Sequence, residues 1–231
     1  MENSSRLDRY SDFLNIVVWG SIWGIFEATA GYLLHLLPFN FGWIVWYPAA
    51  CFFMVSAYRK SGNASSVIYV ALLCASIKLL NLLLPIRIDK VINPSVSIVL
   101  ESISMYLAIK ILGEGQKKTF VKAISAISMN TAWRLMFALY LLVAVPDWMR
   151  DISVISSTEK IISFFITQNI ITSLVIFICY QFLNIILKPI KALEGKISKV
   201  YSLLPQNKIH VFKVGIVCMM FCLNIILELL L

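Results

Sequence analysis

The chain has 231 residues, of which 60% are hydrophobic and only 14% are charged. Soluble globular domains carry about 25% charged residues, and several apolar runs here reach the roughly 20 residues that a helix needs to cross a bilayer. The composition excludes an ordinary soluble domain. It predicts an all-α protein, a polytopic bundle of transmembrane helices that forms a single integral membrane domain over residues 1–231.

Seven membrane spans are predicted from the apolar runs and from the turn residues that separate them. In chain order they cover residues 13–35, 41–58, 65–84, 94–113, 119–146, 161–187 and 209–231. The first six form a core bundle over about residues 10–190. An amphiphilic stretch at about 188–208 is expected to lie along the membrane surface as a linker, before the extra C-terminal span at about 209–231. No cleaved signal peptide is expected.

Basic residues set the expected orientation, because lysine and arginine accumulate in cytoplasmic loops. With the N-terminus inside, most of them fall on the cytoplasmic side, including Arg59, Lys60, Lys117 and Lys118. This bias accounts for the net charge of +8 without a nucleic-acid partner. We therefore expect a cytoplasmic N-terminus in a multi-pass protein of the cell (plasma) membrane, which in a bacterium is the inner membrane.

Three aromatic residues, Trp43, Trp46 and Tyr47, fall near the outer end of the second predicted span. Tryptophan and tyrosine are enriched where a membrane meets water. We interpret these residues as interfacial anchors, in preference to a surface on which a ligand stacks.

Charged and amide side chains also occur inside the predicted spans, where one charge costs about 2.5–3.5 kcal/mol on insertion scales. They fall at a similar depth in five helices, in the outer half of each span or near its middle. The residues are Glu27, Lys78, Asn81, Glu101, Asn130, Arg134, Gln168 and Asn169. Their common depth predicts a polar pocket that opens outward and binds a substrate through these side chains.

Two buried ion pairs are the alternative interpretation of the same charges. Glu27 with Lys78, and Glu101 with Arg134, would then lock the bundle without forming a site. No spacing of His, Glu or Cys resembles a metal site, and no nucleotide-binding loop or nucleophile–base pair is recognised. We therefore expect neither catalysis nor a metal nor another cofactor.

The first span carries small residues on the helix face that holds Glu27, in the segment GSIWGIFEATAG, and small residues let another helix approach closely. In size, topology, site depth and this segment, the chain resembles the substrate-binding S components of energy-coupling-factor (ECF) vitamin transporters. The resemblance covers about residues 10–190. The chain departs from that family in a very short first outer loop and in a seventh span after Lys208.

The resemblance implies uptake of a small water-soluble compound, such as a vitamin or a precursor. It also implies a separate transmembrane coupling subunit that two ATPases drive. Gly20, Gly24 and Ala28 would be the positions that dock on this subunit.

The resemblance further implies how a substrate is held. Arg134 and Lys78 would bind anionic groups, and Glu27 and Glu101 a cationic or donor group, which suits a zwitterion or a carboxylate-bearing compound. Two other functions remain open. One is a stand-alone, proton-coupled carrier of small solutes, in which Glu27 or Glu101 titrates. The other is a non-transport structural membrane protein in which the charges form buried ion pairs.

Overall fold

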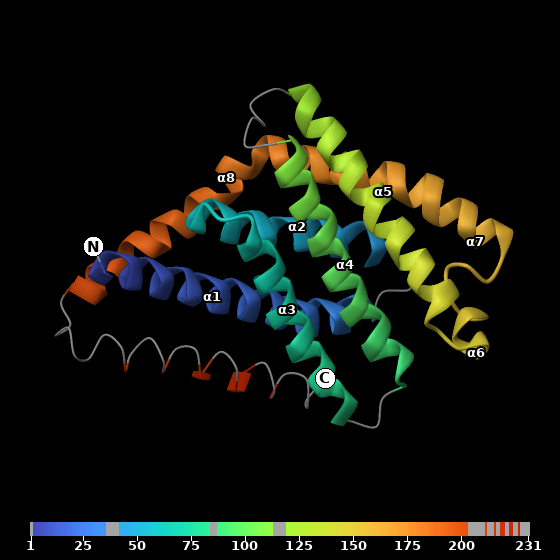
Figure 1. The fold of residues 1–231 in the computed structure, drawn as a ribbon, viewed down its shortest axis with the longest axis horizontal. Helices are drawn as coiled ribbons and strands as arrows, with labels where there is room; N and C mark the ends of the chain where they lie inside the picture. Colours follow the sequence, from blue (N-terminus) through green and yellow to red (C-terminus); the bar gives the residue numbers. More distant parts are fainter. Residues whose placement is uncertain are drawn as a thin grey trace.

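The computed structural model is helical and contains no β-strand in the part of the chain that it describes. That part is the backbone of residues 2–35, 42–83, 87–112 and 119–202, together with seven isolated positions between 211 and 226. The all-α fold class predicted from the composition is confirmed for these residues. Figure 1 shows the arrangement of the helices.

In the described part of the chain, six long helices form the bundle, and four shorter segments join or extend them. The long helices are α1 (Glu2–His35), α2 (Gly42–Ser61), α3 (Ser65–Leu79), α4 (Asp89–Leu112), α5 (Thr119–Val143) and α8 (Gln168–Ser202). The shorter segments are η1 (Leu80–Leu83), α6 (Asp147–Arg150), α7 (Thr158–Ile162) and η2 (Ser163–Thr167). The segment η1 continues α3 as a 3₁₀ turn, and η2 is a π-helical segment that joins α7 to α8.

The end of α2 lies at a turn residue, as predicted, whereas the end of α8 differs from the prediction. α2 stops at Ser61 because Gly62 adopts a φ of 67°, and its N–H donates to the carbonyl of Tyr58 at 2.8 Å, as in a left-handed helix cap. By contrast, α8 does not stop at residue 187, and it continues as one helix into the predicted surface linker as far as Ser202. The rest of that linker and most of the predicted span 209–231 lie outside the described residues.

Among the described residues, four helical segments are long and apolar enough to cross a membrane: Ser65–Leu83, Asp89–Leu112, Thr119–Val143 and Thr158–Lys188. They coincide with the third to sixth predicted spans and make the chain a helical membrane protein. The first two predicted spans correspond to α1 and α2, which are not among these four. α2 is less apolar at its two ends, because its first two turns carry Trp43, Trp46, Tyr47 and Pro48 and its last turn carries Arg59 and Lys60.

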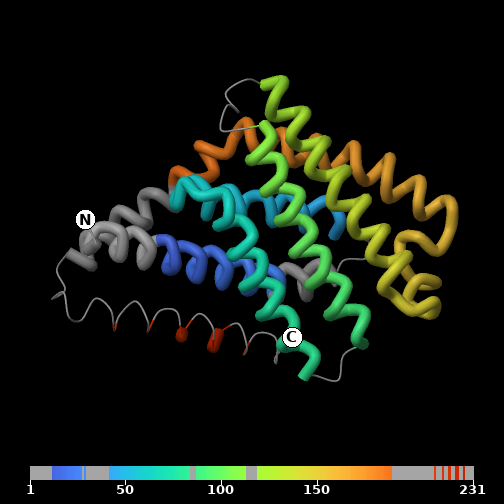
Figure 2. Tube along the Cα trace, viewed as in Figure 1, coloured from blue at the N-terminus to red at the C-terminus, as the bar shows by residue number. Residues whose placement is uncertain are grey.

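The long helices pack as a closed ring in the order α1, α3, α4, α5, α8, α2, so that α2 contacts α1 again. In Figure 1 and in the tube of Figure 2, α3, α4 and α5 run side by side while α8 crosses the molecule. The ring joins segments that are far apart in the sequence. For example, Arg59 near the end of α2 donates to Asn184 of α8 at 2.8 Å. Ring closure also brings the end of α1 and the starts of α2 and α4 to one end of the bundle.

Gly20 lies where α1 packs on α3. A Cβ atom at this position would lie 2.8 Å from Cδ2 of Leu73 and 3.1 Å from its Cβ and Cγ. A helix of the same chain therefore packs on this face, and the role of Gly20 in docking on a separate subunit stays a prediction. Gly24 is buried as well. The side chain of Ala28, the third predicted docking position, lies outside the described residues.

Candidate functional site

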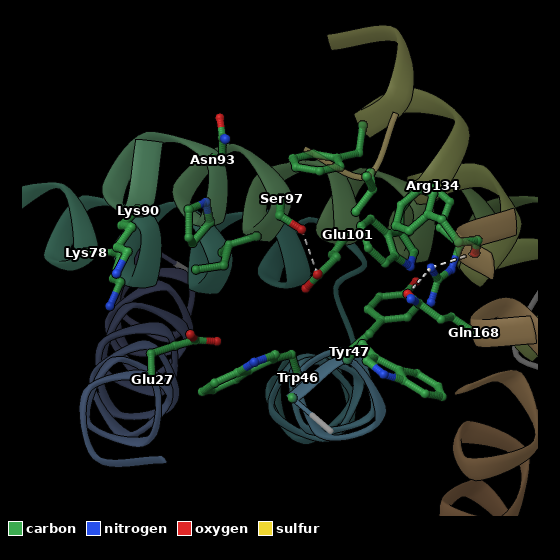
Figure 3. Close-up of a pocket in the computed structure, with 18 residues that line it drawn as sticks. Glu27, Trp46, Tyr47, Lys78, Lys90, Asn93, Ser97, Glu101, Arg134 and Gln168 are labelled. Atoms are coloured by element: carbon green, nitrogen blue, oxygen red, sulfur yellow. Dashed lines mark hydrogen bonds between the residues drawn. The ribbon is translucent and has the colours of Figure 1, made fainter. Parts of the chain in front are cut away.

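A pocket of about 400 Å³ lies at the end of the bundle where α1 and α3 finish and α2 and α4 begin. Residues of α1, α2, α3, α4, α5, η2 and α8 line it, together with one residue from the loop before α7. Lys90 on its rim is exposed, whereas Arg134 is only 1% exposed. The pocket therefore reaches from the surface of the chain into the interior of the bundle (Figure 3).

The pocket brings together predicted site residues from five helices: Glu27, Lys78, Glu101, Arg134 and Gln168. Figure 3 shows Glu27 on the same side as Lys78 and Lys90, with Arg134 and Gln168 on the opposite side and Glu101 between them. Asn81, Asn130 and Asn169 do not line the pocket. Asn81 is buried, and the two other amides support the pocket from behind.

Arg134 occupies the buried end of the pocket and is held by neutral acceptors. Its Nη1 donates to the carbonyl oxygen of Phe164 at 2.8 Å and to Oε1 of Gln168 at 3.5 Å. Its Nη2 donates to Oγ1 of Thr172 at 3.5 Å, and its Nε donates to Oδ1 of Asn130 at 3.2 Å. Most of these acceptors come from η2 and α8, so the last helices of the ring fix the guanidinium that α5 contributes.

Aromatic rings also surround this guanidinium. Its Cζ lies 4.5 Å from the ring centroid of Phe164 and 5.0 Å from that of Trp133, within the range of cation–π attraction. In the part of the chain that the structure describes, no ion pair joins Arg134 to a carboxylate. The alternative interpretation of a Glu101–Arg134 ion pair is therefore wrong, because Arg134 turns toward α8 and bonds there. The positive charge has no bonded counter-charge in this part of the protein.

Asn130 holds Arg134 in place from one turn below it on α5. Its Oδ1 accepts from Nε1 of Trp133 at 2.8 Å as well as from Arg134. Its Nδ2 donates to the carbonyl oxygen of Asn169 at 2.8 Å and to Oγ of Ser173 at 2.9 Å. Both amide atoms of this fully buried side chain are thus satisfied, and they tie α5 to α8 directly behind the pocket.

The π-helical turn η2 supplies a backbone acceptor for Arg134 that could not be predicted from the sequence. The N–H of Gln168 donates to the carbonyl of Ser163, five residues back, and not to Phe164, four residues back as in an α-helix. Arg134 donates to the Phe164 carbonyl from the side. Short π-helical turns inside α-helices often mark functional sites, and this one shapes the pocket wall.

The two pocket carboxylates have different surroundings. Glu101 is 5% exposed, and its Oε1 accepts from Oγ of Ser97 at 3.0 Å. Glu27 is 9% exposed and accepts from Nε1 of Trp23, one turn earlier on α1, at 3.1 Å. Both acids are therefore oriented by a neighbour on their own helix, at positions on the pocket wall.

An aromatic wall from α2 completes the pocket, a role that differs from the membrane-interface position predicted for its residues. Trp43, Trp46 and Tyr47 all line the pocket, and Tyr47 is only 2% exposed. The interpretation as interfacial anchors is wrong for Tyr47, whose ring lies 5.4 Å from that of Trp133 inside the bundle. The spacing i, i+3, i+4 on one helix face is the sequence signal that could have predicted a shared surface.

Comparisons with protein-family models, with curated proteins and with solved structures found no match to this chain. Among the described residues, no group of three or more His, Cys, Asp or Glu side chains is placed to hold a metal ion. Function is therefore inferred from the chemistry of the pocket. That chemistry combines a buried cation, two oriented carboxylates, lysines near the rim and an aromatic wall.

Proposed function

We propose that this chain is a membrane-embedded binding subunit for the uptake of a small water-soluble compound, such as a vitamin or a vitamin precursor. The observation that carries the proposal is the environment of Arg134, a buried guanidinium on a pocket wall whose hydrogen bonds to the described residues all go to neutral acceptors. Charges inside membrane helices are costly, and they usually pair or line a functional cavity. An unpaired cation on a pocket wall fits a binding role better than a structural one.

The proposed topology has six or seven spans, with the N-terminus in the cytoplasm of a cell whose plasma membrane, in a bacterium the inner membrane, holds the protein. Two observations support it. α1 and α2 complete the ring with the four more apolar segments, and the pocket lies at the end of the bundle whose loops carry fewer basic residues. In this orientation the pocket faces outward, where a nutrient arrives.

The proposed energy source is a separate module, as in the ECF transporters that the chain resembles: a transmembrane coupling subunit and its ATPases. The sequence carries no nucleotide-binding loop of its own, which supports an external source. Gly20 packs on α3, and its contact with the coupling subunit stays part of this proposal.

A stand-alone, proton-coupled carrier is the second candidate, and one observation favours it. Glu101 lies on the pocket wall, is nearly buried and accepts one hydrogen bond, from Ser97. A carboxyl group in such a place can take up and release a proton as a solute binds. A purely structural protein is less well supported, since Glu101 and Arg134 form no ion pair with each other.

The proposed binding role is tested with the purified full chain in detergent. A panel of water-soluble vitamins, their precursors and amino acids is screened for a rise in melting temperature. We expect at least one compound to stabilise the protein, and we expect Arg134→Met to abolish that stabilisation. Ile127→Ala, on an exposed apolar face outside the pocket, is the matched control and should respond like the unmodified protein. A panel without any stabilising compound would argue against a nutrient-binding subunit.

The energy source is then tested by uptake of the stabilising compound into cells that express the chain. We expect uptake to require co-expression of a coupling subunit with its ATPases and to survive a protonophore while ATP is maintained. Uptake that occurs without these partners, stops with the protonophore and is lost in Glu101→Gln would favour the proton-coupled carrier instead.

A further inference from the structure

The fixed charges of the pocket leave an excess of positive charge. Lys78, Lys90 and Arg134 line it together with two carboxylates, Glu27 and Glu101. Of the three cations, Lys90 is exposed at the rim and Arg134 is buried at the far end. Positive groups at both depths attract an anionic ligand toward the pocket and then into it.

The buried end also offers hydrogen-bond donors without matching acceptors. A guanidinium has five N–H groups, and the bonds of Arg134 to the described residues number four, two of them long at 3.5 Å. Next to it, the hydroxyl of Tyr47 is buried and has no hydrogen-bond partner among the described residues. Figure 3 shows Tyr47 between Glu101 and Arg134. A buried donor without a partner is uncommon in a folded protein, and a ligand oxygen would satisfy it.

The aromatic wall that α2 contributes is held in position by its neighbours. Trp46 packs edge-on against Phe26 behind it, with ring centroids 5.9 Å apart and an interplanar angle of 77°. A Cβ atom at Gly42 would lie 2.8 Å from Nε1 of Trp46, so the glycine is what lets this indole lie where it does. Trp43 adds a second half-buried indole on the same wall. Aromatic faces held in this way favour stacking of a planar ring.

We propose that the pocket binds a planar aromatic anion with its anionic group inward, against Arg134 and the Tyr47 hydroxyl, and its ring along Trp43 and Trp46. This inference rests on the proposed function and names the class of compound that the same pocket takes. Lys78 and Lys90 then draw the anion in from the rim, and Arg134 is its final partner. Glu101, which lies between this buried end and the side of Glu27 and Lys78, then faces the ring and selects a hydrogen-bond donor on it.

Three matched probes test the proposal on the full chain in detergent: 4-hydroxybenzoate, 4-hydroxybenzamide and trans-4-hydroxycyclohexanecarboxylate. The amide keeps the ring and removes the charge, and the cyclohexane compound keeps the charge and removes the planar ring. By calorimetry we expect 4-hydroxybenzoate to bind at least about tenfold more tightly than either analogue, because a charge-assisted bond and ring stacking are each lost in one of them.

Variants of the chain test which residue causes each preference for the benzoate over its two analogues. We expect Tyr47→Phe, which removes only the unpartnered hydroxyl, to keep the fold and to bind 4-hydroxybenzoate several-fold more weakly. We expect Arg134→Gln to bind the benzoate and the benzamide equally. Gly42→Ala should displace Trp46 and abolish the preference for the benzoate over the cyclohexane compound. Gly215→Ala is the matched control, because a Cβ there meets nothing within 4 Å.

Equal affinity for the benzoate and the benzamide in the unmodified chain would overturn the anionic part of the inference. Equal affinity for the benzoate and the cyclohexane compound would overturn the aromatic part. No binding of any probe up to about 10 mM, a concentration at which ligands of this size normally register, would overturn both. A non-aromatic compound from the nutrient panel that stabilises the chain, and does not stabilise Arg134→Met, would keep the proposed function and reject this inference.

Discussion

Asn130 is the side chain on which the geometry behind the pocket depends most. It accepts from Trp133 and Arg134 and donates to Asn169 and Ser173, so one residue satisfies groups from two helices. Removing it leaves several buried polar groups without a partner, and each such group costs about 1–3 kcal/mol. The amide therefore stabilises the fold and also orients the cation that the ligand meets.

We predict that Asn130→Leu, which keeps the volume of the side chain, lowers the free energy of unfolding by about 2–4 kcal/mol. The measurement is the unfolding midpoint in detergent. Ser104→Ala is the control, because the hydrogen bond of the Ser104 hydroxyl within the described residues goes to the carbonyl of Leu100 on its own helix. A variant Asn130→Leu that unfolds at the same midpoint as the control would show that these bonds do not form in the membrane protein.

Arg134 and Glu101 give a second prediction at the residue scale. A buried ion pair couples its members strongly, and breaking one costs about 3–5 kcal/mol. Because Arg134 bonds to neutral groups and Glu101 to Ser97, we expect the effects of Arg134→Met and Glu101→Leu on stability to add, with a coupling of less than about 1 kcal/mol. Unfolding of the two single variants and the double variant measures this coupling. A double variant that regains the stability lost in Arg134→Met would restore the ion-pair interpretation.

At the scale of helices, the contact between α1 and α3 gives a third prediction. A methyl group at position 20 meets Leu73 at 2.8 Å, so Gly20→Ala forces the helices apart or moves the leucine. We expect a loss of about 1–3 kcal/mol in stability, as for other overpacked contacts, and partial recovery in the double variant Gly20→Ala/Leu73→Ala. Thermal unfolding of the variants checks this. Gly215→Ala, with open space around it, should behave like the unmodified chain.

If Gly20→Ala instead left stability unchanged and weakened the association with a coupling subunit, the glycine would belong to an intersubunit face after all. Double-variant recovery is the observation that separates the two roles, because Leu73 belongs to this chain.

The depth of polar groups along each helix could be predicted from the sequence, but their neighbours could not. A residue's position in an apolar run fixes how deep it lies, which is why Glu27, Lys78, Glu101, Arg134 and Gln168 were expected at one level, and all five line one pocket. Which helices are adjacent depends on how the whole set packs. The ion-pair interpretation therefore gives Arg134 an acid as its partner, whereas most of its acceptors come from η2 and α8.

The same limit explains what was missed on α2 and at the π-helical turn. Trp43, Trp46 and Tyr47 suit either a membrane interface or a pocket, and only the placement of α2 within the ring distinguishes the two. The turn at Ser163–Thr167 follows no sequence rule for helix interiors, since neither glycine nor proline lies in it. Its Phe164 carbonyl accepts from Arg134 of α5, a contact that no local sequence pattern predicts.

For the whole molecule, orientation in the membrane gives a fourth prediction. With the native cysteines replaced, a membrane-impermeant thiol reagent applied to intact cells should label Asp151→Cys, near the pocket end. It should not label Asn63→Cys, in the loop between α2 and α3. Both positions are exposed in the described structure, and both should react once the membranes are opened. Labelling at position 63 in intact cells would reverse the proposed topology, because the basic loops would then lie outside.

Closure of the ring by α8 has a consequence for how the protein is made. A chain that is synthesised from its N-terminus places α5 in the bilayer before α7, η2 and α8 exist. Arg134 and Asn130 then lack the Phe164, Gln168, Thr172 and Asn169 groups that bond them in the finished protein. The incomplete bundle carries a membrane-embedded cation with fewer acceptors, so we expect its first five helices to be less stable than the complete bundle. Assembly of the native bundle is therefore coupled to the arrival of its last core helix, and the binding site forms only when biosynthesis of that helix is complete.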